Sequence, residues 1–337
     1  MARVFIDGFE AGDLKLWDVV YGGAVIASGS LMNGVYCLSC NSTATLYAQK
    51  TLPAAAEYYL AFRYLGMSSN YSYCVCSFYN GATQLGKILR SPATGLLTFY
   101  RGTGAGTAIA TGMIPVALNA NTLIEVRYKP HDTAGVVQVK INGVFDPGLD
   151  FSAAPKDTTD GATTIDGIRF GGDGSNYPSC YFDNIVIDDA AWPGDTKIQI
   201  ILVTGAGAVA AQWTPISTPA SLNFECVNEN PASETDYVQT NTTGHLDLYA
   251  AGNLVGSIES IKCVQVQALV VKEGAPTPLN LRLAINSGGT EYEGGDNAVP
   301  ATTSKAFQKV WQIDPKTTGA WIPAGVNALE IGMKAVA

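Results

Sequence analysis

The sequence predicts an all-β protein made of two sandwich domains. Short runs rich in Val, Ile, Tyr, Phe and Thr recur from end to end, separated by Gly, Pro, Asn and Asp, while helical periodicity is scarce. The chain has 337 residues, which is enough for two domains that each bury a core of their own.

The clearest strand-like runs lie in the first half of the chain. The pair Asn142-Gly143 follows one of them and precedes Val144-Phe145, and it is the strongest short hairpin signal in the sequence. The runs are YYLAFRYL at 58–65, YSYCVCSFY at 71–79, LIEVRYK at 123–129 and VVQVKI at 136–141.

A domain boundary is predicted at 188–196, where two acids, a Pro and a Gly interrupt the strand pattern. We place a first domain at 1–190, a linker at 191–194 and a second domain at 195–337. Strand-like runs resume after the boundary, at 197–203, 261–271, 279–285, 307–313 and 328–333.

Composition and charge exclude several classes of partner. Hydrophobic residues make up 47% of the chain, charged residues 15%, and the formal net charge is −9, with no basic face in either half. Nucleic acid is therefore not an expected partner. No apolar run approaches the ~20 residues of a membrane helix, and the N-terminus has no apolar stretch of signal-peptide length. We expect a soluble protein made in the cytoplasm.

The seven cysteines are expected to be reduced and mostly buried. Their number is odd, and Cys37 and Cys40 lie three apart in a strand-like run, so their side chains should point to opposite faces. That geometry argues against a zinc knuckle and against a redox motif. Without export, the glycosylation sequons at Asn41, Asn70 and Asn241 are expected to be chance matches.

Residues 3–190 resemble a laminin-G or concanavalin A-like jelly-roll domain. The opening Phe5-Ile6-Asp7-Gly8-Phe9-Glu10, followed by Trp17, is similar to the start of many such domains. The hairpin around Asn142-Gly143 and the final run FDNIVID at 182–188 occur in the order typical of that family. The resemblance implies a sandwich fold and leaves the function open.

Residues 195–337 resemble a module of structural proteins of tailed bacteriophages. In those proteins it commonly follows a laminin-G-like domain across a Trp-Pro-x-Gly-Asp joint, which Trp192 to Asp195 nearly reproduces. The resemblance implies a virion protein, a surface decoration or fibre-like component of head or tail. It would act by binding capsid or tail subunits or copies of itself. In this hypothesis 195–337 attaches the protein to the particle and 1–190 faces outward.

A carbohydrate-binding module that recognises host surface glycans is the main alternative. Its candidate contacts are Asp173, Asn176 and Tyr177, which can bind and stack on a sugar or supply oxygen ligands to calcium. A loop in which Gly adopts positive φ and Asn and Asp bond their own backbone explains the same residues, and we favour it. Asp183 is interpreted as stabilising the fold, and no cofactor is expected.

A dinucleotide site and a histidine-based catalytic site are both considered and rejected. The stretch 201–210 imitates a dinucleotide fingerprint, with Glu225 placed to hold a ribose, but Pro215 and Pro219 prevent the helix that such a site needs. We expect a Gly-rich hairpin there. His131 and His245 are the only histidines, too few for a triad or a paired-histidine zinc motif.

A glycoside hydrolase is a remote alternative, because concanavalin-like folds also host glucanases with acids alternating along one strand. The nearest match is Glu291-Tyr292-Glu293, flanked by glycine pairs, which we interpret as a turn. We therefore expect no catalytic residues and no enzyme activity.

Overall fold

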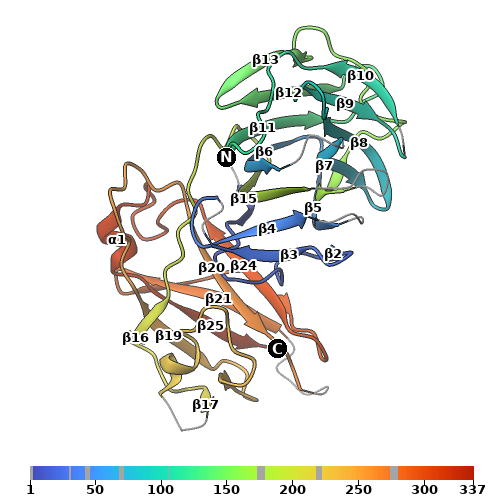
Figure 1. Ribbon diagram of the computed structural model, residues 1–337. Coiled ribbons are helices and arrows are strands. Elements are labelled where there is room, and N and C mark those ends of the chain that lie inside the picture. The colour runs from blue at the N-terminus through green and yellow to red at the C-terminus, as the bar shows by residue number, and fades with distance from the viewer. Residues whose placement is uncertain are drawn as a thin grey trace. The chain divides into compact units, whose positions relative to one another are not determined.

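The protein forms two compact units, Met1–Ile198 and Gln199–Ala337, in a computed structural model of the whole chain (Figure 1). The structure describes residues 3–29, 32–41, 46–67, 72–104, 106–172, 179–217, 222–273 and 280–337. Within these ranges the helical segments are a 3-10 turn, η1 (Asn223–Cys226), and one turn of α-helix, α1 (Pro323–Asn327). The predicted all-β fold is confirmed.

Unit 1 (Met1–Ile198) is a sandwich of two antiparallel sheets. The first sheet has eight strands, in the order β13 (Val144–Asp150), β12 (Val136–Ile141), β11 (Thr122–Lys129), β6 (Tyr58–Gly66), β15 (Ser179–Asp188), β4 (Tyr36–Asn41) and β3 (Val25–Ser28), with β1 (Arg3–Asp7) paired to β15. The second has seven, in the order β10 (Thr107–Thr111), β9 (Leu97–Arg101), β8 (Thr83–Arg90), β7 (Tyr73–Asn80), β14 (Ile165–Gly171), β5 (Tyr47–Ala55) and β2 (Val19–Tyr21).

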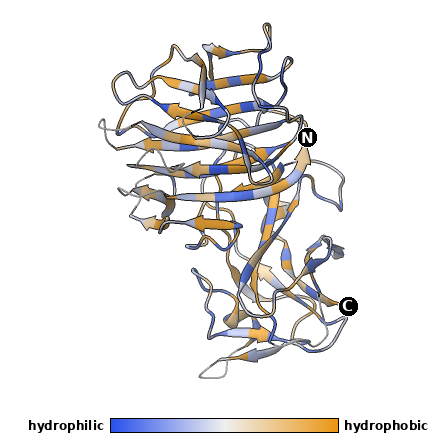
Figure 2. Cartoon of the chain, turned by 90° about the vertical axis from the view of Figure 1, so that its right-hand side faces the viewer, coloured by the Kyte–Doolittle hydropathy of each residue, from blue (hydrophilic) through white to orange (hydrophobic). Residues whose placement is uncertain are grey.

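The core of unit 1 lies between these two sheets and is rich in aromatic rings. Apolar and polar residues alternate along many of its strands (Figure 2), as expected when one face of each sheet is buried. The rings of Phe78 and Tyr128 stack with centroids 4.0 Å apart, and Phe62, Phe170 and Phe182 meet at 5.0 to 6.1 Å. Such contacts, made between β7 and β11 and between β6 and β14, hold the sheets together.

The predicted hairpin at Asn142-Gly143 is confirmed. β12 and β13 are joined by these two residues, with φ of 50° at Asn142 and 82° at Gly143. Both values lie in the left-handed region that a two-residue hairpin turn requires and that Asn and Gly adopt most readily.

Two buried aspartates fasten the N-terminal segment. The Asp7 carboxylate accepts hydrogen bonds from the Phe9 N–H at 2.7 Å and from the Trp17 indole at 2.8 Å. Asp183 accepts from the backbone N–H groups of Asn33 and Asn184. Both carboxylates are buried, and their oxygens accept hydrogen bonds from backbone and indole N–H groups. This agrees with the interpretation of Asp183 as a residue that stabilises the fold.

Unit 2 (Gln199–Ala337) is a smaller β-sandwich. Its main sheet runs in the order β16 (Val203–Ala206), β19 (Leu246–Ala251), β25 (Glu330–Val336), β21 (Asn280–Ser287) and β22 (Thr290–Glu293), with β23 (Asn297–Ala298) paired to β21. Two further ribbons pair β17 (Thr214–Ile216) with β18 (Tyr237–Gln239) and β20 (Val264–Val270) with β24 (Lys305–Trp311).

The core of unit 2 is formed where the β20–β24 ribbon covers one face of the main sheet. Val266 and Trp311 from the ribbon cluster with Leu283 and Ile285 of β21 and with Met333 of β25. The opposite face of the sheet carries Arg282 and Lys334 together with a small buried cluster of Leu246, Leu248 and Ala284. Unit 2 therefore has the two-layer arrangement that defines a sandwich.

Three local predictions in and around unit 2 are wrong. Residues 197–202 are not a strand, because β16 begins at Val203. The stretch 201–210 is not a hairpin, since β16 pairs with the distant β19 and β17 pairs with β18. Glu291 to Glu293 is not a turn but part of β22, and the turn lies at Gly288 and Gly289, where φ is 56° and 79°.

The segment predicted as a linker, 191–194, packs against unit 1. The Trp192 indole meets the rings of Tyr59 and Phe145 edge to face, and the Lys140 ammonium lies 4.0 Å from its centroid. Asp195 accepts two hydrogen bonds from the Arg63 guanidinium at 2.6 Å. Unit 1 accordingly ends at Ile198.

The cysteines are free thiols, and all except Cys263 are buried. Cys37 packs with Leu65 and Tyr181. Cys40 is fully buried and lies opposite Cys180 on the neighbouring strand, β15, without a disulfide between them. Burial raises the pKa of the Cys37 thiol to about 12. Such thiols behave as small apolar side chains.

Candidate functional site

The outward face of the seven-stranded sheet carries an unusual row of polar side chains. In antiparallel pairs, residues directly opposite each other point to the same side of the sheet. Gln49 lies opposite Arg169, Arg169 opposite Ser77, and Ser77 opposite Lys87. Tyr79 and Gln84 form the next such pair. We call these six residues the polar face: Gln49, Ser77, Tyr79, Gln84, Lys87 and Arg169.

Arg169 is held between two tyrosine rings. Its guanidinium carbon lies 3.7 Å from the ring centroid of Tyr47 and 4.4 Å from that of Tyr79. Its Nε and Nη2 both donate to Gln49 Oε1, at 3.2 and 2.9 Å. The far side of Tyr47 stacks on Tyr21, with centroids 5.2 Å apart. The stack spans four neighbouring strands and fixes the plane of the guanidinium.

Two buried polar atoms on this face have no hydrogen-bond partner. They are Ser77 Oγ and Gln84 Nε2, in residues that are 0% and 9% exposed. Gln84 Oε1 has only a long contact, 3.5 Å, with the Tyr79 hydroxyl. A buried polar group without a partner costs about 1–3 kcal/mol, so each such group in a folded protein needs an explanation.

The turn between β9 and β10 bounds the polar face. Lys87, only 1% exposed, donates from Nζ to the Gly104 carbonyl of that turn at 2.5 Å. Lys87 therefore lies beneath the turn, whereas Tyr21, at the far end of the tyrosine stack, is 53% exposed.

A second candidate is a shallow depression of about 350 Å³ on the outward face of the eight-stranded sheet. Burial raises the pKa of the Glu125 carboxyl on its floor, against the opposing effects of Lys140 and of the Gly194 N–H. The groups around it are largely engaged with each other, Arg63 with Asp195 and Trp192 with Lys140. Its lining residues are Arg63, Leu123, Glu125, Lys140, Asn142, Gly143, Trp192, Gly194 and Asp195.

The residues proposed from sequence as glycan or calcium contacts, Asp173, Asn176 and Tyr177, lie outside the described residues. Within the described part of the chain, no three His, Cys, Asp or Glu side chains are gathered so that they could hold a metal ion. No helix in that part is long and apolar enough to cross a membrane.

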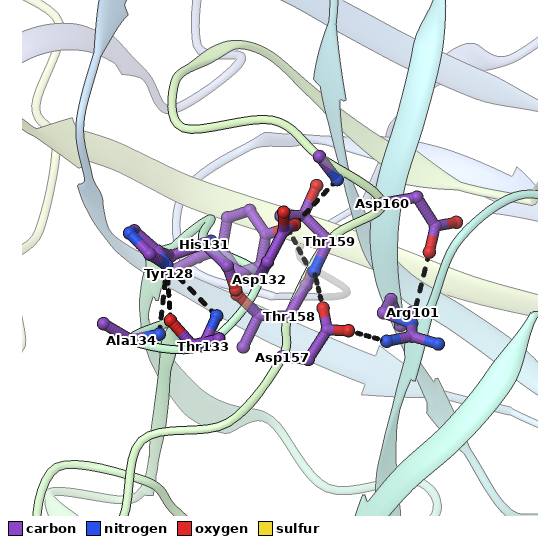
Figure 3. A network of polar contacts seen from close by, with 11 residues as sticks. Arg101, Tyr128, His131, Asp132, Thr133, Ala134, Asp157, Thr158, Thr159 and Asp160 are labelled. Carbon is purple, nitrogen blue, oxygen red and sulfur yellow. Dashed lines mark hydrogen bonds and ion pairs between the residues drawn. The ribbon is translucent and has the colours of Figure 1, made fainter.

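Both histidines take part in local loop structure. His131 Nδ1 accepts hydrogen bonds from the backbone N–H groups of Thr133 and Ala134 (Figure 3). The same network joins the loop after β11 to the segment 156–161, where Arg101 pairs with Asp157 and Asp160 (Figure 3). His245 Nδ1 contacts the Thr240 hydroxyl at 2.9 Å.

Glu291 and Glu293 point to the same side of β22, as acids two apart in a strand must. Lys334 Nζ pairs with both, and Arg282 binds Glu293 at 2.9 Å. The two basic groups lower the pKa of Glu293 to about 2, while burial raises the pKa of Glu291. The acids belong to an ion-pair network with Asp296, which also binds Arg282.

Sequence reasoning missed the polar face. Its signal was nevertheless present: Ser77 interrupts the apolar run 71–79, and Arg169 stands inside the run IDGIRFG. A polar residue at an outward position of a central strand identifies the face only when the register of the neighbouring strands is known. The sequence did not show which residues lie opposite each other.

No protein family model matches the chain, and no curated protein matches it in sequence. Among solved structures, a Bacillus subtilis protein of unknown function with a galectin-like fold is 12% identical, with a TM-score of 0.41 over 57% of this chain and 98% of that chain. Carbohydrate-binding module CBM66 from Bacillus subtilis is 10% identical, with a TM-score of 0.33 over 50% and 94%. The alginate lyase Aly36B, in complex with an alginate tetrasaccharide, is 15% identical, with a TM-score of 0.33 over 57% and 94%.

Unit 1 is thus a concanavalin-like jelly-roll β-sandwich by its own two sheets and strand order. At these identities and TM-scores the likenesses identify no ligand. We interpret the site from its own residues.

Proposed function

We propose that unit 1 is a glycan-binding module that holds its ligand on the polar face and does not cleave it. The observation that supports this most directly is the unpaired amide donor Gln84 Nε2, whose side chain contacts Tyr79, one of the two rings that hold Arg169. A sugar hydroxyl accepts hydrogen bonds, so it can satisfy this amide N–H.

The surroundings of this donor also suit a sugar. Tyr47 and Tyr79 supply apolar ring edges and hydroxyl groups, and Arg169 supplies further N–H donors beside them. Binding sites for small polar ligands typically combine such aromatic surfaces with a few fixed polar groups. A row that crosses several strands gives room for more than one sugar unit.

The test is a glycan array probed with the whole chain, followed by calorimetry on the best ligand with the variant Gln84→Met. Methionine has a similar volume and no polar atom, so it removes an unsatisfied donor without leaving a cavity. We expect affinity to fall about fivefold, the factor for roughly 1 kcal/mol, while thermal stability stays the same or rises.

Gln138→Met is the control for affinity, because Gln138 is a similarly buried glutamine, 7% exposed, on the outward side of the other sheet, where it bonds Arg127 and Asp150. It should leave glycan affinity unchanged. Affinity that survives Gln84→Met, or an array without a single binding glycan, contradicts the proposal. Release of reducing ends by the wild type contradicts its non-catalytic part.

We propose a virion as the location of this module. The support is the resemblance of residues 195–337 to structural modules of tailed bacteriophages and the joint-like segment Trp192 to Asp195. In that setting unit 2 would bind capsid or tail subunits and unit 1 would face the host surface.

Labelling of purified particles tests this location. Gold-labelled antibodies against the chain should mark the head or tail of particles purified from a lysate of a host that carries the gene. Recovery of the chain only from the particle-free fraction contradicts a virion role and leaves the glycan proposal standing.

A further inference from the structure

The seven-stranded sheet is basic, although the protein as a whole is acidic. The full chain has 20 basic and 29 acidic residues. The strands of this sheet contain a single acidic residue, Asp166, against five basic ones, which are Lys50, Lys87, Arg90, Arg101 and Arg169. Lys87 and Arg169 belong to the polar face, whereas Lys50 and Arg90 lie opposite the buried Ile168 and Leu97 and point to the inner side of the sheet.

Several of these charges already have partners. Lys50 pairs with Asp18, and Arg101 pairs with Asp157 and Asp160. Asp166 accepts the backbone N–H of Gly81. Arg90 donates to the backbone carbonyls of Val116 and Ser91. On the polar face, among the described residues, no carboxylate forms an ion pair with Arg169, and its hydrogen-bond acceptor is the neutral amide of Gln49.

The geometry of Arg169 leaves one edge of its guanidinium unused. A guanidinium has five N–H groups, and the two bonds to Gln49 Oε1 use Nε and one N–H of Nη2. The remaining edge, formed by Nη1 and the second N–H of Nη2, has the spacing that binds both oxygens of a carboxylate. Because Tyr47 and Tyr79 cover the two faces of the group, a ligand can approach only along this edge.

We propose that the glycan is acidic, and that Arg169 binds the carboxylate of a uronic acid unit through this free edge. The proposal rests on the glycan-binding function proposed above and names its ligand class. A planar carboxylate matches the fork of a fixed guanidinium edge with two parallel hydrogen bonds. Gln49 fixes the position of the guanidinium without neutralising it, and Gln84 lies against Tyr79 as a donor for a hydroxyl group of the same sugar chain.

The test uses four polymers as probes and the whole chain as the protein. They are sodium polygalacturonate, the same polymer with its carboxyl groups reduced to alcohols, dextran sulfate, and neutral dextran. We expect polygalacturonate to bind best, with an affinity at least about tenfold higher than that of its carboxyl-reduced form. A tenfold difference corresponds to the loss of one charge-assisted pair of hydrogen bonds. Binding should weaken as sodium chloride is raised.

Gln49→Glu is the decisive variant. It places a carboxylate on the edge of Arg169 that Gln49 now binds, which adds an ion pair and should keep or raise thermal stability while neutralising the guanidinium. We expect polygalacturonate affinity to fall at least about tenfold. Arg169→Gln should have the same effect, and Arg169→Lys should recover only part of the affinity, because lysine lacks the fork.

Arg127→Gln is the matched control. Arg127 also lies over a tyrosine ring, Tyr59 at 5.4 Å, but on the other sheet and paired with Glu57. It should leave affinity unchanged. Three results would overturn the acidic-sugar proposal and leave glycan binding itself standing. They are equal binding of the carboxyl-reduced polymer, a preference for dextran sulfate, and full binding of polygalacturonate by Gln49→Glu. If none of the four polymers binds and the glycan array is also empty, both proposals fail together.

Discussion

Trp192 meets Tyr59 edge to face, with ring centroids 5.5 Å apart at an interplanar angle of 78°. This contact and the Arg63–Asp195 ion pair fix the segment that follows β15 to the outward face of the eight-stranded sheet. The first unit therefore extends several residues past its last strand.

Truncation before this segment should destabilise unit 1. We expect the fragment 1–190 to melt about 4–8 °C below the fragment 1–198, because it loses two aromatic contacts of Trp192 worth ~0.5–1.5 kcal/mol each and a partly exposed ion pair of smaller value. Scanning calorimetry of the two fragments measures the difference. Identical melting temperatures would show that the segment is attached only loosely.

The buried carboxyls of Asp7 and Asp183 predict a pH-dependent stability. Burial raises the pKa of each to about 7, against the hydrogen bonds that they accept. A carboxyl whose folded pKa exceeds its unfolded pKa stabilises the fold fully below the unfolded value, near 4, and loses that contribution as pH rises through 7.

We therefore expect Asp7 to contribute about 2–3 kcal/mol more to the stability of unit 1 at pH 5 than at pH 8. Urea unfolding of the whole chain at both pH values, compared with the variant Asp7→Asn, isolates this contribution, since asparagine does not titrate. The idea is wrong if wild type and variant change in parallel between the two pH values.

The thiols should differ in reactivity according to burial. Cys263 is the one cysteine that is not buried, and burial raises the pKa of Cys37 to about 12 and that of Cys226 to about 11. Under native conditions at pH 8 a thiol reagent should modify about one group quickly, and Cys263→Ser should abolish that phase. All seven should react after denaturation. A denatured titration of five or fewer would mean that disulfides form.

Much of unit 1 could be predicted from the sequence because local signals there are strong. The alternation in 136–141 and the Asn142-Gly143 pair depend on neighbours in sequence, and both proved correct. Unit 2 was less predictable where pairing is long-range. Val203 to Ala206 pairs with residues more than forty positions away, so the glycines beside it suggested a local hairpin that does not exist.

The candidate site was less predictable for the same reason. Gln49, Ser77 and Arg169 come from three strands that are far apart in the sequence and adjacent in the sheet. No short motif contains them. The only ligand contacts that the sequence suggested lie in a single Gly-rich loop, for which a purely local role was favoured, because a sequence pattern brings together only residues that are close in the chain.

The acid pair of β22 yields the last prediction, which separates a structural role from a catalytic one. Glu293 is bound by both Lys334 and Arg282, and these lower its pKa to about 2, so its stabilising contribution is present above about pH 4.5 and is lost as pH falls toward 2. Glu291 contacts Lys334 at 3.7 Å.

At pH 7 we expect Glu293→Gln to lower the unfolding free energy of unit 2 by about 1 kcal/mol and Glu291→Gln by less, since the pairs are partly exposed. Neither variant should alter the release of reducing ends from any polysaccharide. Urea unfolding and a reducing-end assay on the same preparations measure both effects. Cleavage by the wild type that either substitution abolishes would establish a catalytic pair and end the interpretation of these acids as an ion-pair network.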